Sequence, residues 1–410
     1  MKRSITSIAA LLLAASMFAQ GPGPQGAPQG QRPPQGQRPP RPEQQAGPQA
    51  QQNTVASRLV EEYVQHQDSY MPDFSVDGKN SKVRNVILLI GDGMGLGATA
   101  SAYFGNGGEL TMTNLRTMGY VLTQSYDNFT TDSAASGTAY ATGSKTKNGY
   151  LGMSPMGEKL TNIPEIVEPL GYACGVLSTD DLNGATPAAF FAHQMARGST
   201  DGIWADLATS HLAFASAGTM SAFDKQPFST QENIKKSFTL VGDRNDARIA
   251  DSKRLLYLPP SVTLDRGDYL PATTRLAIDY LSNRSKKGFF LMVEGARIDK
   301  ESHSNKYDTM IKETLDFDKA VEEAIRFAEK DGHTLVIISA DHETGALIVR
   351  KGDLEEGYVQ GTYSSTGHSP MMVPLYAYGP HSRDFGGYQH NSDVCNKIVE
   401  LLTKGKVSGR

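Results

Sequence analysis

Residues 86–95 read Val-Ile-Leu-Leu-Ile-Gly-Asp-Gly-Met-Gly. The five apolar residues are typical of a buried β-strand, and the glycine-rich residues after them indicate a loop where the strand ends. Similar apolar runs lie at residues 173–177, 289–293, 335–338 and 373–377. Amphipathic, helix-like stretches include residues 309–329 and 393–402. Strands buried on both faces and separated by helices predict an α/β fold, a three-layer α/β/α sandwich with a large, mostly parallel central sheet.

Acidic residues and histidines follow several of these strands. In a parallel sheet the carboxyl ends of the strands meet at one edge, where ligands bind. The residues at or just beyond the strand ends are Asp92, Glu294, Asp299, His303, Asp341, His342 and His368. Mixed carboxylate and imidazole ligands suit zinc, and positions with oxygen ligands alone suit magnesium. Each residue alone also fits an ordinary turn, cap or loop role, but their joint placement favours a metal site.

Residues 131–139, Thr-Asp-Ser-Ala-Ala-Ser-Gly-Thr-Ala, predict a helix that begins near Ser133. The backbone N–H groups and the dipole at a helix N-terminus favour a bound anion. Ser133 also fits the ordinary role of an N-cap. No histidine lies near it in the sequence, so activation of its hydroxyl group would require a metal ion.

A further segment, Asn-Gly-Ala-Thr-Pro at residues 183–187, predicts the start of a helix that carries His193 and Arg197. Arg197 fits either a surface charge or a phosphate ligand. The second interpretation has a chemical basis, because a guanidinium group can donate two parallel hydrogen bonds to a tetrahedral oxyanion.

The composition excludes several classes of protein. A net charge of −4 over 410 residues excludes a nucleic-acid binder that works by bulk positive charge. The body of the chain contains no run of about 18 apolar residues, so no internal membrane span is predicted. The two cysteines, Cys174 and Cys395, exclude a disulfide scaffold and thiolate-rich metal sites. Both are expected to be buried free thiols.

Three regions are predicted along the chain. Residues 1–19 have the pattern of a secretory signal peptide, with Lys2 and Arg3 before an apolar segment and small residues, which predicts export to the periplasm or the medium. Residues 20–52 are rich in Pro, Gln and Gly and contain the hexapeptide Pro-Gln-Gly-Gln-Arg-Pro twice in tandem, as in a disordered linker. Residues 53–410 are expected to form the folded domain.

Six motifs in this domain resemble those of the alkaline phosphatases, and they occur in that family's order. They are Ile-Gly-Asp-Gly-Met-Gly at 90–95, Thr-Asp-Ser-Ala-Ala-Ser at 131–136, Ala-Thr-Pro-Ala-Ala at 185–189, Val-Glu-Gly-Ala with Ile-Asp-Lys and His at 293–303, Ala-Asp-His-Glu-Thr-Gly at 340–345, and Thr-Gly-His at 366–368. The resemblance spans residues 85–380 and implies an alkaline-phosphatase-like catalytic domain.

The resemblance implies a role for each matching residue. Ser133 would be the nucleophile that is transiently phosphorylated, and Arg197 the arginine that binds phosphate, oriented by Asp132. Lys300 resembles the lysine that reaches phosphate through water in some bacterial members. The resemblance also implies three metal sites. The ligands of one zinc ion would be Asp299, His303 and His368, and those of the second would be Asp92, Asp341 and His342. A third site, usually for magnesium, would use Asp92, Thr186 and Glu294.

The chain departs from the family pattern in two places. Many members have Asp or His two positions before the matched Thr186, where this chain has Gly184. Either the third metal site is weaker and more hydrated, or Asp181 or Asn183 moves in. Residues 198–288, which contain Trp204, match the family poorly and are expected to form a variable surface insertion over the site.

The expected activity is hydrolysis of small phosphate monoesters by a secreted zinc enzyme, and a homodimer is expected because the family is commonly dimeric. A phosphodiesterase of the same superfamily is the nearest alternative, although diesterases generally lack the third-site carboxylate that Glu294 supplies. A sulfatase would need Pro and Arg after its nucleophile, and residues 134–137 contain neither. A non-catalytic phosphate- or zinc-binding surface protein should have lost the nucleophile or a zinc ligand, and none is missing.

Overall fold

The computed structural model describes residues 53–58, 67–263 and 265–403. The predicted signal peptide and linker, residues 1–19 and 20–52, therefore lie outside the described residues. Within the described part, no helix is long and apolar enough to cross a membrane.

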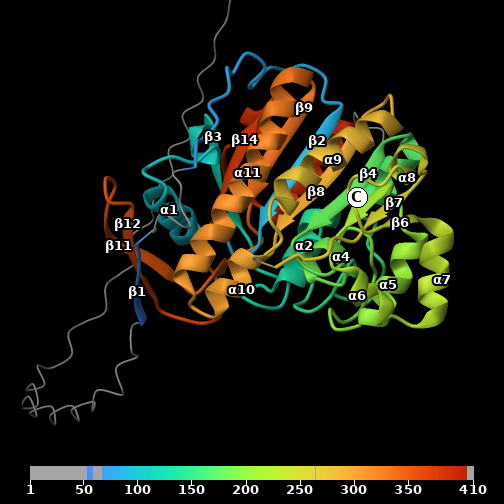
Figure 1. Cartoon of the computed structure of the whole chain (residues 1–410), viewed down its shortest axis with the longest axis horizontal. Helices are drawn as coiled ribbons and strands as arrows, with labels where there is room; N and C mark the ends of the chain where they lie inside the picture. The colour runs from blue at the N-terminus through green and yellow to red at the C-terminus, as the bar shows by residue number, and fades with distance from the viewer. Residues whose placement is uncertain (1–52, 59–66, 264, 404–410) are drawn as a thin grey trace, which may run out of the picture. The chain divides into compact units, whose positions relative to one another are not determined.

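A ten-stranded sheet forms the centre of the fold, in the order β15-β3-β14-β9-β2-β8-β4-β5-β7-β6 (Figure 1). The strands are β2 Asn85–Gly91, β3 Thr117–Leu122, β4 Ala173–Ser178, β5 Phe214–Ser216, β6 Thr239–Val241, β7 Leu255–Tyr257, β8 Phe289–Gly295, β9 Thr334–Ser339, β14 Val373–Tyr378 and β15 Gly387–His390. The five apolar runs found in the sequence form β2, β4, β8, β9 and β14, which confirms the predicted strands.

The direction of the strands agrees with the predicted, mostly parallel sheet. In this sheet β14 pairs antiparallel with both of its neighbours, β3 and β9. The other neighbouring strands run parallel. The carboxyl ends of β2, β4, β8 and β9 therefore meet at one edge of the sheet.

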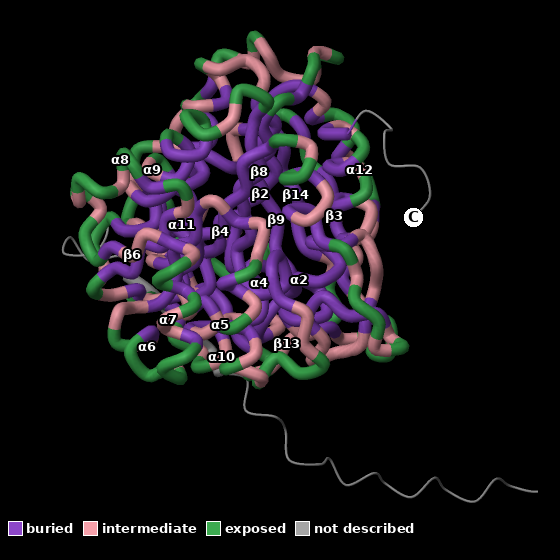
Figure 2. The backbone as a smooth tube through the Cα atoms, turned by 90° about the vertical axis from the view of Figure 1, so that its right-hand side faces the viewer, coloured by how far each residue is buried: buried purple, intermediate pink, exposed green. Residues whose placement is uncertain are grey.

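Helices cover both faces of the sheet, which confirms the three-layer architecture. Helices α9 Tyr269–Arg284 and α11 Tyr307–Asp331 pack together on one face, and α12 Asn391–Thr403 lies on the other side against α2 Ser133–Thr142 (Figures 1 and 2). The buried residues of α11 recur every three or four positions, the spacing of one helix face. This helix ends at Gly332, whose φ of +71° suits glycine. The two amphipathic stretches found in the sequence correspond to α11 and α12.

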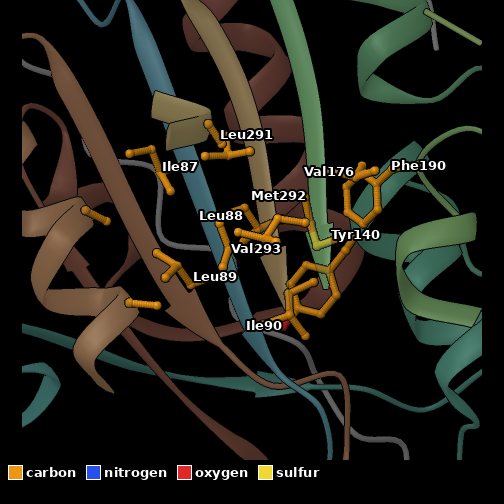
Figure 3. Close-up of a cluster of buried hydrophobic side chains, with 14 of the residues drawn as sticks. Ile87, Leu88, Leu89, Ile90, Tyr140, Val176, Phe190, Leu291, Met292 and Val293 are labelled. Carbon is orange, nitrogen blue, oxygen red and sulfur yellow. The ribbon is translucent and has the colours of Figure 1, made fainter. Parts of the chain in front are cut away.

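The core lies on both faces of the central strands. Every residue of β2, β4, β8 and β9 is buried. Figure 3 shows side chains of β2 and β8 packed beside Tyr140, Val176 and Phe190 from neighbouring elements. Each fully buried leucine or isoleucine side chain contributes about 1.5–3 kcal/mol. Burial on both faces explains why these strands are continuously apolar instead of alternating with polar residues.

The expectation for residues 198–288 is wrong in one respect: much of this segment belongs to the central sheet. It contributes β5, β7 and β6 at the edge beyond β4, and also the whole of α9. Trp204, on α5 Thr200–Thr209, is buried and its ring packs 6.0 Å from that of Phe223. Each of these three strands has only three residues, so the sequence contains no long apolar run that would have predicted them.

Two smaller sheets lie outside the central one. The first joins β1 Asn53–Arg58, β12 Tyr358–Tyr363 and β11 Leu347–Asp353. The second pairs β10 Glu343–Thr344 with β13 His368–Ser369, and Thr344 stands opposite His368. This pairing brings His368 next to the loop that follows β9. Cys174 and Cys395 are both buried and unbridged, as predicted.

Candidate active site

The carboxylates and histidines found at the strand ends come together in two clusters. Asp92 follows β2, and Asp341 and His342 follow β9. Their ligand atoms lie within 4.8 Å of one another, as do those of a second cluster, which comprises Asp299, His303 and His368. Both sets are the ones that the sequence predicts. The rings of His342 and His368 stack with centroids 3.5 Å apart, so the two clusters are adjacent.

The first cluster converges on one imidazole nitrogen. His342 Nε2 lies 3.3 Å from Asp341 Oδ2, 3.4 Å from Asp92 Oδ1 and 3.2 Å from Ser133 Oγ. All these residues are buried. A single nitrogen cannot donate a proton to three oxygens at once, whereas a cation among these atoms would contact all of them.

The charge of this cluster is unbalanced without a cation. Asp92 Oδ1 and Asp341 Oδ2 have no hydrogen-bond partner among the described residues. Burial, followed by the negative charge of Asp341, raises the pKa of Asp92 well above its usual range. Asp341 is held in place through its other oxygen, Oδ1, which accepts hydrogen bonds from the backbone N–H groups of Gly93 and His342. Two buried carboxylate oxygens without a hydrogen bond, beside an imidazole, form a donor set that fits a divalent cation such as zinc.

The second cluster has its histidines oriented by the backbone. His303 Nδ1 lies 2.5 Å from the carbonyl oxygen of Thr366, and His368 Nδ1 lies 2.9 Å from that of Thr131. A carbonyl oxygen can only accept, so each Nδ1 carries the proton and each Nε2 is directed at the cluster. The two Nε2 atoms are 3.2 Å apart, and Asp299 lies within 3.6 Å of both. Metal-binding histidines are commonly oriented in this way by an acceptor behind the ring.

The pKa values of the second cluster show how strongly its groups interact. The hydrogen bond with Asp299 raises the pKa of His303 to about 9. Burial raises the pKa of Asp299, but its hydrogen bond with His303 and the nearby histidine charges more than offset this, and the pKa is low. Burial, with the charge of His342, lowers the pKa of His368. A cation at the Nε2 atoms would replace the proton that His303 otherwise retains.

Ser133 lies at the N-terminus of α2, as the sequence predicts. The N-cap is Asp132, whose Oδ1 accepts a hydrogen bond of 2.9 Å from the N–H of Ala135. Ser133 is therefore the first residue of the helix, and the interpretation of Ser133 as an N-cap is wrong. No histidine lies near Ser133 in the sequence. The fold nevertheless brings Nε2 of His342, which is 209 residues further along the chain, to 3.2 Å from Ser133 Oγ.

Arg197 is joined to the same helix terminus through Asp132. Its NH1 group donates a hydrogen bond of 3.2 Å to Asp132 Oδ2, which also accepts from the N–H of Gly149. The contact agrees with the orienting role that the resemblance implies. The predicted helix through Arg197 is wrong, because α4 covers only Ala185–Ala188. Beyond it, the backbone of residues 194–197 bonds instead to that of residues 149–151.

The predicted third-site residues, Thr186 and Glu294, are both buried. Thr186 Oγ1 makes no hydrogen bond of ordinary geometry with the described residues, although it lies close enough to Glu294 to lower the pKa of that carboxyl group. The net effect on Glu294 is the opposite: burial, followed by the charge of Asp180, raises its pKa to about 8. Ser178 Oγ donates a hydrogen bond to the Glu294 carboxylate.

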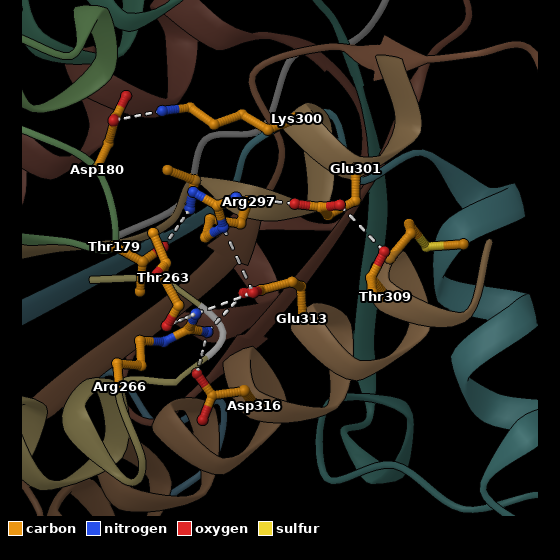
Figure 4. Close-up of polar contacts among 12 residues, drawn as sticks. Thr179, Asp180, Thr263, Arg266, Arg297, Lys300, Glu301, Thr309, Glu313 and Asp316 are labelled. Carbon is orange, nitrogen blue, oxygen red and sulfur yellow. Dashed lines mark hydrogen bonds and ion pairs between the residues drawn. The ribbon is translucent and has the colours of Figure 1, made fainter. Parts of the chain in front are cut away.

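Sequence reasoning missed Asp180. The two residues expected to compensate for Gly184 have other partners: Asn183 Oδ1 accepts from Trp204 Nε1 at 3.2 Å, and the Asp181 carboxylate lies against Gly218. The carboxylate beside Gly184 belongs to Asp180, which forms an ion pair with Lys300 (Figure 4). Its signal was its position, two residues beyond β4, at the same edge of the sheet as the other acidic residues.

The arrangement can support nucleophilic chemistry on an anion. A buried hydroxyl stands at a helix N-terminus, where N–H groups favour negative charge. A guanidinium tied to the same terminus can bind oxyanions. Two adjacent donor sets fit divalent cations, and His342 of one set lies 3.2 Å from the hydroxyl oxygen.

Comparison with known proteins gives results consistent with this site. The family model for alkaline phosphatase matches residues 83–220 and 263–355. Alkaline phosphatase 3 of Bacillus subtilis is 33% identical, and the match covers 79% of this chain and 90% of that protein. Alkaline phosphatase of Escherichia coli is 31% identical over 78% of this chain and 86% of that protein.

A solved structure is similar over the same region. It is a mutant of the alkaline phosphatase from the Antarctic bacterium TAB5, with Mg bound in its M3 site. The identity is 33%, the TM-score is 0.74, and the match covers 79% of this chain and 99% of that one.

Proposed function

Because the chain belongs to the alkaline phosphatase family, we propose that it hydrolyses small phosphate monoesters through a phosphoserine intermediate at Ser133. The observation that carries the proposal is the position of Ser133 Oγ. It lies at the N-terminus of α2, 3.2 Å from Nε2 of His342, whose ring stacks on that of His368 in the second cluster of metal-ligand type.

The reaction follows from the residues around Ser133. Arg197, held by Asp132, and the N–H groups of α2 bind the phosphoryl oxygens on which negative charge accumulates. Ser133 Oγ attacks phosphorus as the bond to the ester oxygen breaks, and the alcohol leaves. Water then cleaves the phosphoserine and releases inorganic phosphate. Covalent catalysis of this kind divides one difficult displacement into two easier ones.

We propose two zinc ions and one magnesium ion as cofactors. The zinc ligands would be Asp299, His303 and His368 in one site and Asp92, Asp341 and His342 in the other. When bound, such ions lower the pKa of a coordinated hydroxyl group and stabilise charge on a leaving oxygen. The magnesium site would use Asp92, Thr186 and Glu294.

A paired assay tests the activity. Initial rates would be measured on nitrophenyl phosphate and on the matching diester at pH about 9, with zinc and magnesium and again after chelation. A chelator-sensitive preference for the monoester by orders of magnitude supports the proposal. A preference for the diester supports the phosphodiesterase alternative, and no rate on either ester supports a non-catalytic binding protein.

We also propose that the protein is exported to the periplasm or the medium and forms a homodimer. Export rests on the signal-like pattern of residues 1–19. N-terminal sequencing of protein recovered outside the cytoplasm should begin beyond that segment; an intact Met1 would overturn the proposal. Sedimentation velocity would distinguish a dimer from a monomer.

A further inference from the structure

Position 184 favours glycine because a side chain would clash with neighbouring atoms, and not because of its backbone conformation. Its φ of −55° and ψ of 141° are open to any residue. A Cβ atom at this position would lie 2.8 Å from Asp180 Oδ2 and 2.9 Å from the carbonyl oxygen of Asp181. Both distances are shorter than such contacts normally are. The missing side chain of Gly184 therefore leaves the volume that the carboxylate of Asp180 occupies.

Two contacts hold Asp180 in that volume, and one of them leads on to Glu294. Its carboxylate forms an ion pair with Lys300 on α10 Arg297–His303 (Figure 4). Its backbone N–H donates a hydrogen bond of 2.9 Å to Ser178 Oγ, and the same hydroxyl donates to Glu294. Ser178 thus connects the backbone of Asp180 directly with the carboxylate of Glu294.

The polar groups near Asp180 form a set of ligands that fits a cation. The hydroxyl of Thr186, which is 1% exposed, has no hydrogen bond of ordinary geometry with the described residues. Glu294 is equally buried and feels the negative charge of Asp180. A buried hydroxyl and two nearby carboxylates provide oxygen ligands, the kind that magnesium prefers.

We propose that Asp180 supplies the carboxylate of the third cation site, with Thr186 and Glu294, in place of the side chain that position 184 lacks. The inference rests on the proposed function and deepens it. Asp180 is a positioning residue. It adds negative charge for Mg²⁺, and its ion pair connects this site with Lys300, the lysine expected near phosphate. Position 180 and position 184 are alternatives, because a side chain at one excludes the carboxylate of the other.

The first test measures magnesium binding directly. Purified protein would be stripped with a chelator, saturated with zinc and titrated with MgCl₂ by calorimetry. Asp180→Asn should weaken Mg²⁺ binding ~10- to 100-fold, the usual cost of altering the carboxylates that support a metal site. Asp181→Asn is the matched control, because that carboxylate lies against Gly218, and it should leave the affinity unchanged. Equal affinity in Asp180→Asn and the wild type would overturn the inference.

A swap of the two positions separates charge from folding defects. Asp180→Ala combined with Gly184→Asp removes one carboxylate and introduces another in the vacated volume. We expect this double variant to bind Mg²⁺ at least tenfold more tightly than Asp180→Ala alone. Gly184→Ala should weaken binding more in the wild type than in Asp180→Ala, because only the contact with the Asp181 carbonyl oxygen remains in the variant. Equal losses from Gly184→Ala in both backgrounds would contradict the exclusion of one side chain by the other.

The outcomes separate this inference from the proposed function. If the wild type prefers monoesters but Asp180→Asn retains Mg²⁺ affinity, the role of Asp180 is wrong and the proposed function stands. If Asp180→Asn loses Mg²⁺ affinity but the wild type hydrolyses no monoester, the cation site stands and the proposed function fails.

Discussion

The Nε2 atoms of His303 and His368 lie 3.2 Å apart, although the Nδ1 of each ring is already bonded to a backbone carbonyl. Both rings are therefore oriented toward one point. Asp299 lies within 3.6 Å of both nitrogens, so the three side chains form a donor set that fits a cation.

Metal removal should accordingly lower stability as well as activity. We expect chelation to lower the thermal midpoint and zinc to restore it, since a ligand at 100 times its Kd stabilises the folded state by ~2.7 kcal/mol. His368→Ala should reduce the zinc-induced shift. His211→Ala, which removes an exposed imidazole paired with Glu168, should retain it. Scanning calorimetry with and without zinc checks this, and equal shifts in both variants would contradict the zinc assignment.

Ser133→Ala should abolish turnover and leave the midpoint of unfolding nearly unchanged. The wild type, quenched in acid during turnover of a labelled monoester, should retain label on Ser133, and the variant should not. Ser136→Ala is the matched control on the same helix. Its hydroxyl bonds to the Asp341 carbonyl and to Asn391, so its loss should cost about 1 kcal/mol of stability and leave the label in place. Activity in the Ser133→Ala variant would contradict the covalent mechanism.

Asp132 should have separable effects on stability and on substrate binding. Asp132→Ala removes the N-cap of α2, which costs ~1 kcal/mol, and also frees Arg197. Arg197→Ala leaves the cap intact, and the loss of a charged hydrogen bond to phosphate should weaken inhibition by inorganic phosphate ~10- to 100-fold. Denaturant unfolding and phosphate inhibition constants measure the two effects. A large loss of stability in Arg197→Ala would contradict this division.

A buried ion-pair network should be important for stability. The Arg266 guanidinium donates to Glu313 at 2.5 and 2.9 Å and to Asp316 at 2.6 Å, and the side chains of Arg266 and Glu313 are at most 4% exposed (Figure 4). Arg266→Met removes both hydrogen bonds to the buried Glu313 carboxylate, which keeps only the Arg297 guanidinium 3.7 Å away, and should cost about 3–5 kcal/mol. Arg266→Met with Glu313→Gln should recover part of this loss. Urea unfolding of both variants tests the prediction, and equal midpoints for the two would refute it.

Lys145 should make the free energy of unfolding increase as the pH rises above about 8. Burial lowers its pKa from 10.5 to about 8, and Nζ donates hydrogen bonds to the carbonyl oxygens of Leu122 and Gln124. Between these values the unfolded chain binds more protons than the folded one, so stability increases as the pH rises through this window. The stability difference between the wild type and Lys145→Met should therefore change in favour of the wild type from pH 8 to 10. A constant difference would mean that Lys145 titrates normally in the fold.

The sequence by itself determined the architecture and most of the site. Short, continuous apolar runs beside turn signals are typical of strands buried on both faces, so β2, β4, β8 and β9 follow from composition, and α11 and α12 follow from periodicity. Because parallel strands end at one edge, the carboxylates and histidines beyond Gly91, Gly295 and Ser339 had to approach one another. The strand ends therefore predict that these side chains gather at one edge, whereas their division into two clusters was implied only by the resemblance to the alkaline phosphatases.

Only the tertiary structure decided which side chains fill the space between those elements. The contact of His342 with Ser133, the place of residues 214–257 at the sheet edge and the ion pair of Asp180 with Lys300 all join segments that periodicity treats separately. The physical reason is packing: a carboxylate enters a site only if no other atom occupies its volume. That volume is set by residues from several elements at once, and no local sequence pattern records it.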